Sequence, residues 1–327
     1  MSEKQTSIFP WPVVDSPDRG TMQPGVFQWD DPLFDGIEWP YFAIHGAQPG
    51  PAAVVIAGVH GGEYPGILAA QRVARNIEPA ELKGSLLILP ILNPPSFWER
   101  SAFVSPADGQ NLNRVFPGNV SGTYSERLAY YTLRDIIQPT DILIDLHSGD
   151  VFEALASHVG GYVLGDSARD DLTKDVITAF GLPYVWLDEL GERRTSLTAA
   201  STGLGKHTIF VEVGGNALFT EQEVEQVTQG IMNALVVYGL LEVDLPISRS
   251  KTIYRAGSVT SPCDGLWLPT IVLEQHVEIG ELLGRMTDAL GEEISQIRAE
   301  VAGMVLYHMT SLAVRQGDPL VALVTVS

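Results

Sequence analysis

The glycine-rich segment Gly58–Glu63 (GVHGGE) carries side chains suited to binding a metal ion. It places the imidazole of His60 and the carboxylate of Glu63 three positions apart. The two glycines between them let the backbone turn tightly enough for both side chains to reach one ion. Imidazole nitrogen and carboxylate oxygen are normal zinc ligands, and a catalytic zinc site needs a third protein ligand and an open position for water. The segment therefore predicts part of a catalytic metal centre.

The third ligand is expected from the segment Asp145–Gly149 (DLHSG), which contains His147. This segment ends an apolar run, as the first one does, so both histidines are expected at strand ends. Asp145 lies two residues before His147, hence on the same strand face, and is expected to accept the second N–H of its imidazole. Because other divalent metals use similar ligands, the ion is inferred to be zinc from the ligand types together with the resemblance described below.

Glu212 lies within the apolar run Thr208–Val213, where an unpaired carboxylate is costly to bury. We interpret it as a general base beside a metal-bound water, with its pKa raised by the apolar surroundings. An ordinary ion pair is the alternative interpretation of this residue.

The loop Asn111–Gly118 (NLNRVFPG) places an amide and a guanidinium side by side. Arg114 is suited to grip a carboxylate through two hydrogen bonds or to stabilise an oxyanion, and Arg100 is a second candidate. A surface salt bridge is the alternative for Arg114. The other histidines have no such partners nearby in the sequence and are interpreted as structural: His45, His158, His207, His276 and His308.

These polar residues must be positioned by an alternation of strands and helices. Short, continuous apolar runs favour strands buried on both faces, whereas apolar residues at helical spacing favour helices. Such an alternation predicts an α/β fold with a mostly parallel, mixed sheet flanked by helices, in which ligands bind at the carboxyl ends of strands. Strands are predicted over 52–58, 85–91, 141–146 and 208–213, and helices over 64–74, 124–137, 168–180 and 221–239.

The pattern changes at about residue 245. Residues 1–245 are predicted to form the catalytic α/β domain, with an irregular lead-in over 1–40 that is rich in turn-forming and aromatic residues. Residues 246–327 contain short β-type runs separated by glycine and are predicted to form a smaller all-β domain. A weak internal repeat relates residues 265–283 to residues 303–320.

The composition excludes several classes of partner. The net charge of −20 would repel a nucleic-acid backbone and an anionic membrane surface. The single cysteine, Cys263, excludes an internal disulfide and a multi-cysteine metal site. The chain also contains no apolar run of the length that a signal peptide or a membrane span needs. We therefore expect a cytoplasmic protein without nucleic-acid or membrane partners. The composition is also compatible with a homo-oligomer.

Taken together, these motifs resemble the aspartoacylase and succinylglutamate desuccinylase family, a branch of the zinc carboxypeptidase-like hydrolases. The matching segments are 58–63, 111–118, 145–149 and 211–215, in the family's order, and residues 246–327 are similar to its barrel-like C-terminal domain. The resemblance implies hydrolysis of an N-acyl group from an amino acid or a similar small amine. It also implies one zinc ion per chain bound by His60, Glu63 and His147, with Glu212 as the base and Asn113 with Arg114 binding a substrate carboxylate.

The sequence departs from the family at Ala102-Phe103, where aspartoacylase-like members tend to have an arginine before an aromatic residue. Polarisation of the acyl carbonyl is then expected to fall to Arg100 or to zinc itself.

Three other functions are weighed. A zinc carboxypeptidase or peptidoglycan amidase would use the same metal site on a peptide, and an open groove would favour it. A biotinyl or lipoyl carrier would need a modifiable lysine at a hairpin tip, and residues 252–327 contain no lysine. A binding protein that has lost the chemistry is disfavoured because all four key residue types are present.

Overall fold

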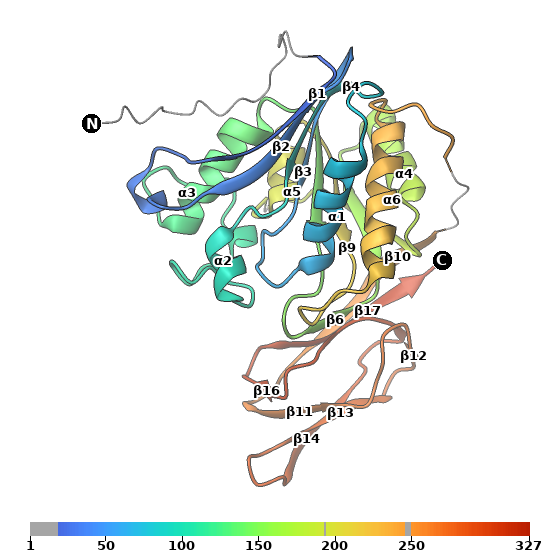
Figure 1. Cartoon of the computed structure of the whole chain (residues 1–327). Helices are drawn as coiled ribbons and strands as arrows, with labels where there is room; N and C mark the ends of the chain where they lie inside the picture. Colours follow the sequence, from blue (N-terminus) through green and yellow to red (C-terminus); the bar gives the residue numbers. More distant parts are fainter. Residues whose placement is uncertain (1–18, 193, 246–249) are drawn as a thin grey trace.

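The computed structural model describes residues 19–192, 194–245 and 250–327. Its described residues form one 13-stranded sheet and one four-stranded sheet (Figure 1). The large sheet contains β1 (Thr21–Phe27), β2 (Trp39–His45), β3 (Gln48–Ile56), β4 (Lys83–Leu89), β5 (Ile142–His147), β6 (Glu153–Leu155), β7 (His158–Val163), β8 (Tyr184–Glu189), β9 (His207–Glu212), β10 (Lys251–Thr260), β12 (His276–Val277), β15 (Gly303–Met309) and β17 (Pro319–Val326). The small sheet contains β11 (Gly265–Pro269), β13 (Leu282–Thr287), β14 (Glu293–Arg298) and β16 (Ala313–Val314).

The centre of the large sheet is parallel. The strand order is β1-β2-β4-β3-β5-β9-β7-β8-β10-β17-β15-β12, with β6 paired to β15. Neighbours β4, β3, β5 and β9 run parallel, as β7, β8 and β10 do among themselves, and the remaining pairs are antiparallel. All six residues of β5 are buried, as the continuous apolar runs predicted. The predicted fold class, a mostly parallel mixed sheet flanked by helices, is confirmed.

Helices cover both faces of this sheet (Figure 1). One face packs against α1 (Tyr64–Asn76), α4 (Ser167–Phe180) and α6 (Glu221–Val237). The other packs against α3 (Tyr124–Tyr131), its π-helical continuation η3 (Thr132–Ile137) and α5 (Leu197–Gly203). The remaining short helices are α2 (Pro94–Glu99), η1 (Pro32–Phe34) and η2 (Leu112–Arg114). Among the described residues, no helix combines the length and apolar character that crossing a membrane requires.

Aromatic side chains of the lead-in complete the second core. Phe27, Trp29, Phe34 and Trp39 are buried, and the Trp39 indole N–H donates to the carbonyl of Leu92 at 2.9 Å. A buried indole needs such a partner, and this one ties the lead-in to the sheet. The expected irregular lead-in thus includes β1, η1 and the start of β2, whereas residues 1–18 lie outside the described part.

The C-terminal segment is joined to the large sheet by hydrogen bonds. β10 pairs in parallel with β8, where Lys251 is opposite Tyr184, and in antiparallel fashion with β17. The described residues from 250 onwards contain strands and no helix, in agreement with the predicted all-β character. Their small sheet shares a core around Trp267 and Leu283 with strands of the large one. The domain division at residue 245 stays a prediction, because residues 246–249 are outside the described part and the large sheet includes strands from both sides.

Candidate metal centre and active site

A tight turn after β3 presents the first two candidate ligands. Gly58 has a φ of +63°, a conformation that favours glycine, and a Cβ there would lie 2.9 Å from the Cα of Ile91. The chain then forms the loop with His60, and Glu63 stands at the N-terminal cap of α1. The sequence therefore places both side chains at the carboxyl edge of the sheet, as predicted.

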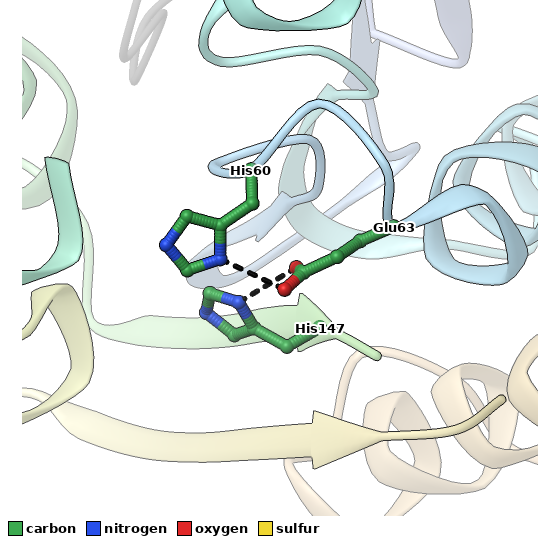
Figure 2. Close-up of side chains that lie close together, drawn as sticks. All are labelled: His60, Glu63 and His147. Carbon is green, nitrogen blue, oxygen red and sulfur yellow. Dashed lines mark hydrogen bonds and ion pairs between the residues drawn. The ribbon is translucent and has the colours of Figure 1, made fainter. Parts of the chain in front are cut away.

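The third candidate ligand converges on the same point. His147 is the last residue of β5, and its Nδ1 lies 2.9 Å from Oε2 of Glu63. The Nδ1 of His60 lies 2.8 Å from Oε1 of Glu63, so one carboxylate contacts both imidazoles (Figure 2). Glu63 and His147 are buried, and potential ligand atoms of the three residues all lie within 4.8 Å of one another.

The surroundings of the two imidazoles fit a metal ion. The Nε2 of His60 lies 3.0 Å from Oδ1 of Asn111, and the Nε2 of His147 lies 3.1 Å from Oδ1 of Asp145. With a proton on each Nε2, both Nδ1 atoms keep a lone pair facing Glu63. Asp145 is itself held by the hydroxyl of Thr198, which donates to Oδ2 at 2.7 Å. Two imidazole nitrogens and a carboxylate are a donor set that suits zinc.

Charge pairing keeps the Glu63 carboxylate ionised. Burial alone would raise the pKa of Glu63, but the imidazoles of His60 and His147 outweigh it and lower that pKa to about 2. Burial likewise acts to lower the pKa of His147, whereas Asp145 and Glu63 together raise it well above its ordinary value. The buried groups therefore favour charge pairing at this position, which a divalent cation also provides.

Glu212 ends β9 directly beside the His147 position of β5 in the parallel ladder. Burial, more than any other cause, raises the pKa of Glu212 well above its usual range. Among the described residues its side chain makes no hydrogen bond or ion pair, so the ordinary ion pair weighed from the sequence finds no partner there. A carboxylate with a raised pKa binds a proton more readily than an exposed one, which suits a group that transfers protons.

The triad and Glu212 open into a cavity of about 490 Å³. Asn113 and Arg114, from η2, also line it. The amide oxygen of Asn113 accepts from the backbone N–H of Leu197 at 2.8 Å, and its nitrogen lies 3.5 Å from Nε2 of His147. Arg114 is exposed and donates to the carbonyl of Asn113 at 2.9 Å. Six of the seven predicted site residues thus lie around one cavity.

Arg100 is the exception. It caps the C-terminus of α2 in a left-handed conformation with a φ of 54°, it is exposed, and it is not among the residues that line the cavity. A catalytic role for Arg100 stays a prediction that requires movement of the chain after α2. Phe103, the aromatic residue of the Ala102-Phe103 pair at which the sequence departs from the family, does line the cavity.

Part of the cavity wall comes from residues that sequence reasoning did not single out. Strands β10, β15 and β17 contribute Arg255, Tyr307 and residues 322–324, while β6 and β8 contribute Glu153 and Trp186 among others. Asn111, which orients His60, lies in the loop Asn111–Gly118 that the sequence analysis described. Its position two residues before Asn113 was the feature that could have indicated a role at the site. The β-strand residues carried no local signal, because only strand pairing over long sequence distances brings them to the site.

The chain belongs to the succinylglutamate desuccinylase/aspartoacylase family, whose catalytic-domain model matches residues 49–238, more than half of the chain. The resemblance inferred from the motifs is thereby confirmed, and the family consists of enzymes that act on N-acyl amide bonds. A curated relative, N-alpha-acetyl-L-2,4-diaminobutyric acid deacetylase of Halomonas elongata, is 32% identical over 289 residues, covering 85% of this chain and 83% of the relative.

Solved structures agree with this membership. A succinylglutamate desuccinylase from Silicibacter sp. TM1040 matches with a TM-score of 0.86 and 26% identity, covering 95% of this chain and 96% of that chain. The product-bound ectoine utilization protein EutE (DoeB) from Ruegeria pomeroyi matches with a TM-score of 0.85 and 26% identity, covering 94% and 96%. The similarity spans both the catalytic-domain match and the C-terminal strands.

Substitution of Gly61 tests how tightly the ligand loop is packed. A Cβ at this position would lie 2.1 Å from the backbone oxygen of Ser96, so Gly61→Ala must displace the loop. We expect a loss of about 1–3 kcal/mol in the free energy of unfolding, from the cost of overpacking, together with weaker metal binding. The control is Gly191→Ala, because Gly191 is exposed and has no atom within 4 Å of its Cβ position. Equal stability and metal content in the two variants would contradict this expectation.

His158, which also lines the cavity, makes stability depend on pH. Its ring is buried beside Trp186 and Phe210, and burial lowers its pKa from 6.5 to about 4. In the unfolded chain the imidazole of His158 is protonated below about pH 6.5, whereas in the folded chain it is protonated only below about pH 4. The free energy of unfolding therefore decreases as the pH drops from about 6.5 to about 4.

Between pH 7 and pH 5 this single group removes about 2 kcal/mol from the free energy of unfolding, on the usual conversion of pKa differences. Urea titrations at both pH values should show that His158→Asn loses less stability on acidification than the wild type by about this amount. The asparagine can still donate to the carbonyl of Ala156, as Nδ1 of His158 does at 2.9 Å. The titratable groups around Glu63 are the same in both proteins, and an equal acid sensitivity of the two would refute the role given to His158.

Proposed function

We propose that this chain is a zinc-dependent deacylase that hydrolyses the amide bond of a small N-acyl amino acid or a related N-acyl amine. The observation that carries the proposal is the convergence of His60, Glu63 and His147 within 4.8 Å, in a cavity that also contains Glu212. Membership of a family of N-acyl amide hydrolases supports it.

In this proposal His60 and His147 hold the ion through Nδ1 and Glu63 through its carboxylate. Zinc in such a site supplies Lewis acidity, which polarises the acyl carbonyl and lowers the pKa of a bound water towards about 7. Asn111 keeps the His60 ring in orientation by accepting its Nε2–H group, and Asp145 pairs with the His147 ring through Oδ1, which lies 3.1 Å from Nε2.

Glu212 moves the proton. Its carboxylate takes a proton from the attacking water as the new C–O bond forms, and then delivers it to the nitrogen of the leaving amine as the C–N bond breaks. Burial raises its pKa, which makes the carboxylate a stronger base than an exposed glutamate for the first transfer. Carboxylate and amine are the products.

Arg114 and Asn113 are proposed to bind the substrate carboxylate. Because the protein carries a net charge of −20, an anionic group must be recognised by a locally placed cation. Arg114 meets this need at the cavity rim, and its guanidinium can bind a carboxylate through two parallel hydrogen bonds.

The C-terminal strands favour a small substrate over a peptide. Strands β10, β15 and β17 supply part of the cavity wall, so they limit the space that a long peptide would need beside the proposed metal ligands. This disfavours the carboxypeptidase or peptidoglycan amidase alternative. The relative from Halomonas elongata is named for N-alpha-acetyl-L-2,4-diaminobutyric acid, a molecule with a carboxylate and a free amino group, and the first substrates to try are compounds of this kind.

Metal removal tests the proposed centre. The purified wild type is expected to contain about one zinc per chain and to release free amine from N-acyl amino acids. His60→Ala/His147→Ala should lose both properties, whereas the exposed His276→Ala should keep both. Metal content by atomic spectroscopy and amine release by a fluorogenic assay are measured on the same samples. A wild type that binds no metal under any condition would overturn the proposal.

Glu212→Gln separates the base from the metal centre. The amide keeps the shape of the side chain but cannot accept the proton, so kcat should fall by about 10²- to 10⁴-fold with the zinc content unchanged. The matched control is Glu78→Gln at an exposed position outside the cavity, which should leave kcat unaltered. Retention of full activity by Glu212→Gln would assign the proton transfer to another group.

A further inference from the structure

Glu153 is a carboxylate in the cavity that forms no ion pair with any of the described residues. It begins β6 and lines the cavity with the apolar side chains of Leu155 and Leu306. Its Oε2 accepts the backbone N–H of Asp150 at 3.1 Å. The hydroxyl of Tyr307, which donates to the carbonyl of Pro319 at 3.3 Å, interacts with the carboxylate and acts to lower its pKa. Among the described residues no lysine, arginine or histidine forms an ion pair with it.

The arginines of the cavity are engaged elsewhere. The guanidinium carbon of Arg255 lies 5.7 Å from the centre of the Trp186 ring. Arg114 donates a hydrogen bond to the carbonyl of Asn113, and its positive charge acts to lower the pKa of Tyr162. The cavity therefore has a cationic part around these residues and an acidic part at Glu153, whose charge is felt by Glu212 and interacts with Glu63.

A carboxylate in this situation is suited to a cationic ligand. Taking it out of water is costly unless an opposite charge or several hydrogen bonds replace the lost hydration. The backbone N–H of Asp150 satisfies only part of its capacity, since an ionised carboxylate offers about four acceptor positions. A substrate ammonium can supply the missing charge and donors, and burial of the site strengthens such a pair.

We infer that Glu153, supported by Tyr307, binds a positively charged amino group of the substrate and thereby selects acyl derivatives of amino acids with a second, free amine. This inference rests on the proposed function, because it assumes that the cavity holds an N-acyl amino acid. One substrate then bears a carboxylate for Arg114 and an ammonium for Glu153, with the scissile amide at the metal centre.

The backbone contacts of Glu153 fix its position in the cavity, which selection of a substrate ammonium requires. β6 pairs with β15, where Glu153 is opposite Met309 and Leu155 is opposite Tyr307. The backbone oxygen of Glu153 also accepts from the N–H of Asn216 at 2.9 Å, in the loop that follows β9. The carboxylate is thus fixed between the C-terminal strands and the loop after the proposed base, which holds it at a set place relative to the reacting bond.

The test compares three substrates that differ only in the end of the side chain. N-acetyl-L-2,4-diaminobutyrate ends in an ammonium, N-acetyl-L-norvaline in a methyl group of similar size, and N-acetyl-L-glutamate in a carboxylate. For the zinc-loaded wild type, kcat/KM should be highest for the ammonium compound by about 10- to 100-fold, the range expected for a hydrogen-bonded charge pair.

Glu153→Gln should lower the ratio of kcat/KM between the ammonium and methyl compounds by about 10-fold or more, and Tyr307→Phe by a smaller factor. The ratio is the readout because the lost charge also alters the field at Glu212 and hence the rate with every substrate. Glu189→Gln is the matched control: it removes one exposed negative charge outside the cavity lining and should leave the ratio unchanged.

Calorimetric binding of the free products to the zinc-loaded protein tests selection without turnover. L-2,4-diaminobutyrate should bind more tightly than L-norvaline to the wild type, and the difference should shrink in Glu153→Gln. An unchanged ratio in Glu153→Gln, or a wild type that does not distinguish the two compounds in either assay, overturns the inference while hydrolysis itself sustains the proposed function. If the zinc-loaded wild type neither hydrolyses the acetylated compounds nor binds the free products, the proposed function is overturned, and this inference with it.

Discussion

The contact between one carboxylate and two imidazoles governs how the rest of this structure is arranged. Glu63 can reach both His60 and His147 only if the turn after β3 and the end of β5 lie side by side at one edge of the sheet. Parallel pairing of β3 with β5, and of β5 with β9, produces this adjacency and adds Glu212 in register with His147. The apolar strands therefore serve to bring four polar side chains, distant in sequence, to a single point.

Electrostatics imposes the second constraint. The protein is strongly acidic, and the cavity concentrates Glu63, Glu153 and Glu212 where water is partly excluded. Each of these carboxylates needs a different form of compensation. Glu63 has two imidazoles, Glu153 has a backbone N–H donor and the influence of the Tyr307 hydroxyl, and Glu212 has a raised pKa that favours its neutral form. Identical chemical groups thus acquire distinct properties from their surroundings.

Local patterns were sufficient to predict the strands and helices that carry the proposed metal ligands. Continuous apolar runs indicated β3, β4, β5 and β9, and glycine-flanked polar residues at their ends indicated the candidate ligands. β7 was missed because Gly160 and Gly161 interrupt its apolar run, and α5 because its small, polar residues lack an apolar periodicity. The wall formed by β10, β15 and β17 was beyond sequence reasoning, since its residues meet the site through pairings that no local pattern encodes.

The parallel pairing of β8 with β10 has a bearing on how the chain is made. Until residues 251–253 have emerged from the ribosome, the outer edge of β8 has no strand beside it, and its backbone N–H and C=O groups are open to pairing with other chains. The proposed metal ligands, all encoded before residue 150, are synthesised much earlier. A nascent chain therefore contains these residues while the edge of its sheet is still unpaired, and the last quarter of the sequence protects that edge against pairing with other chains.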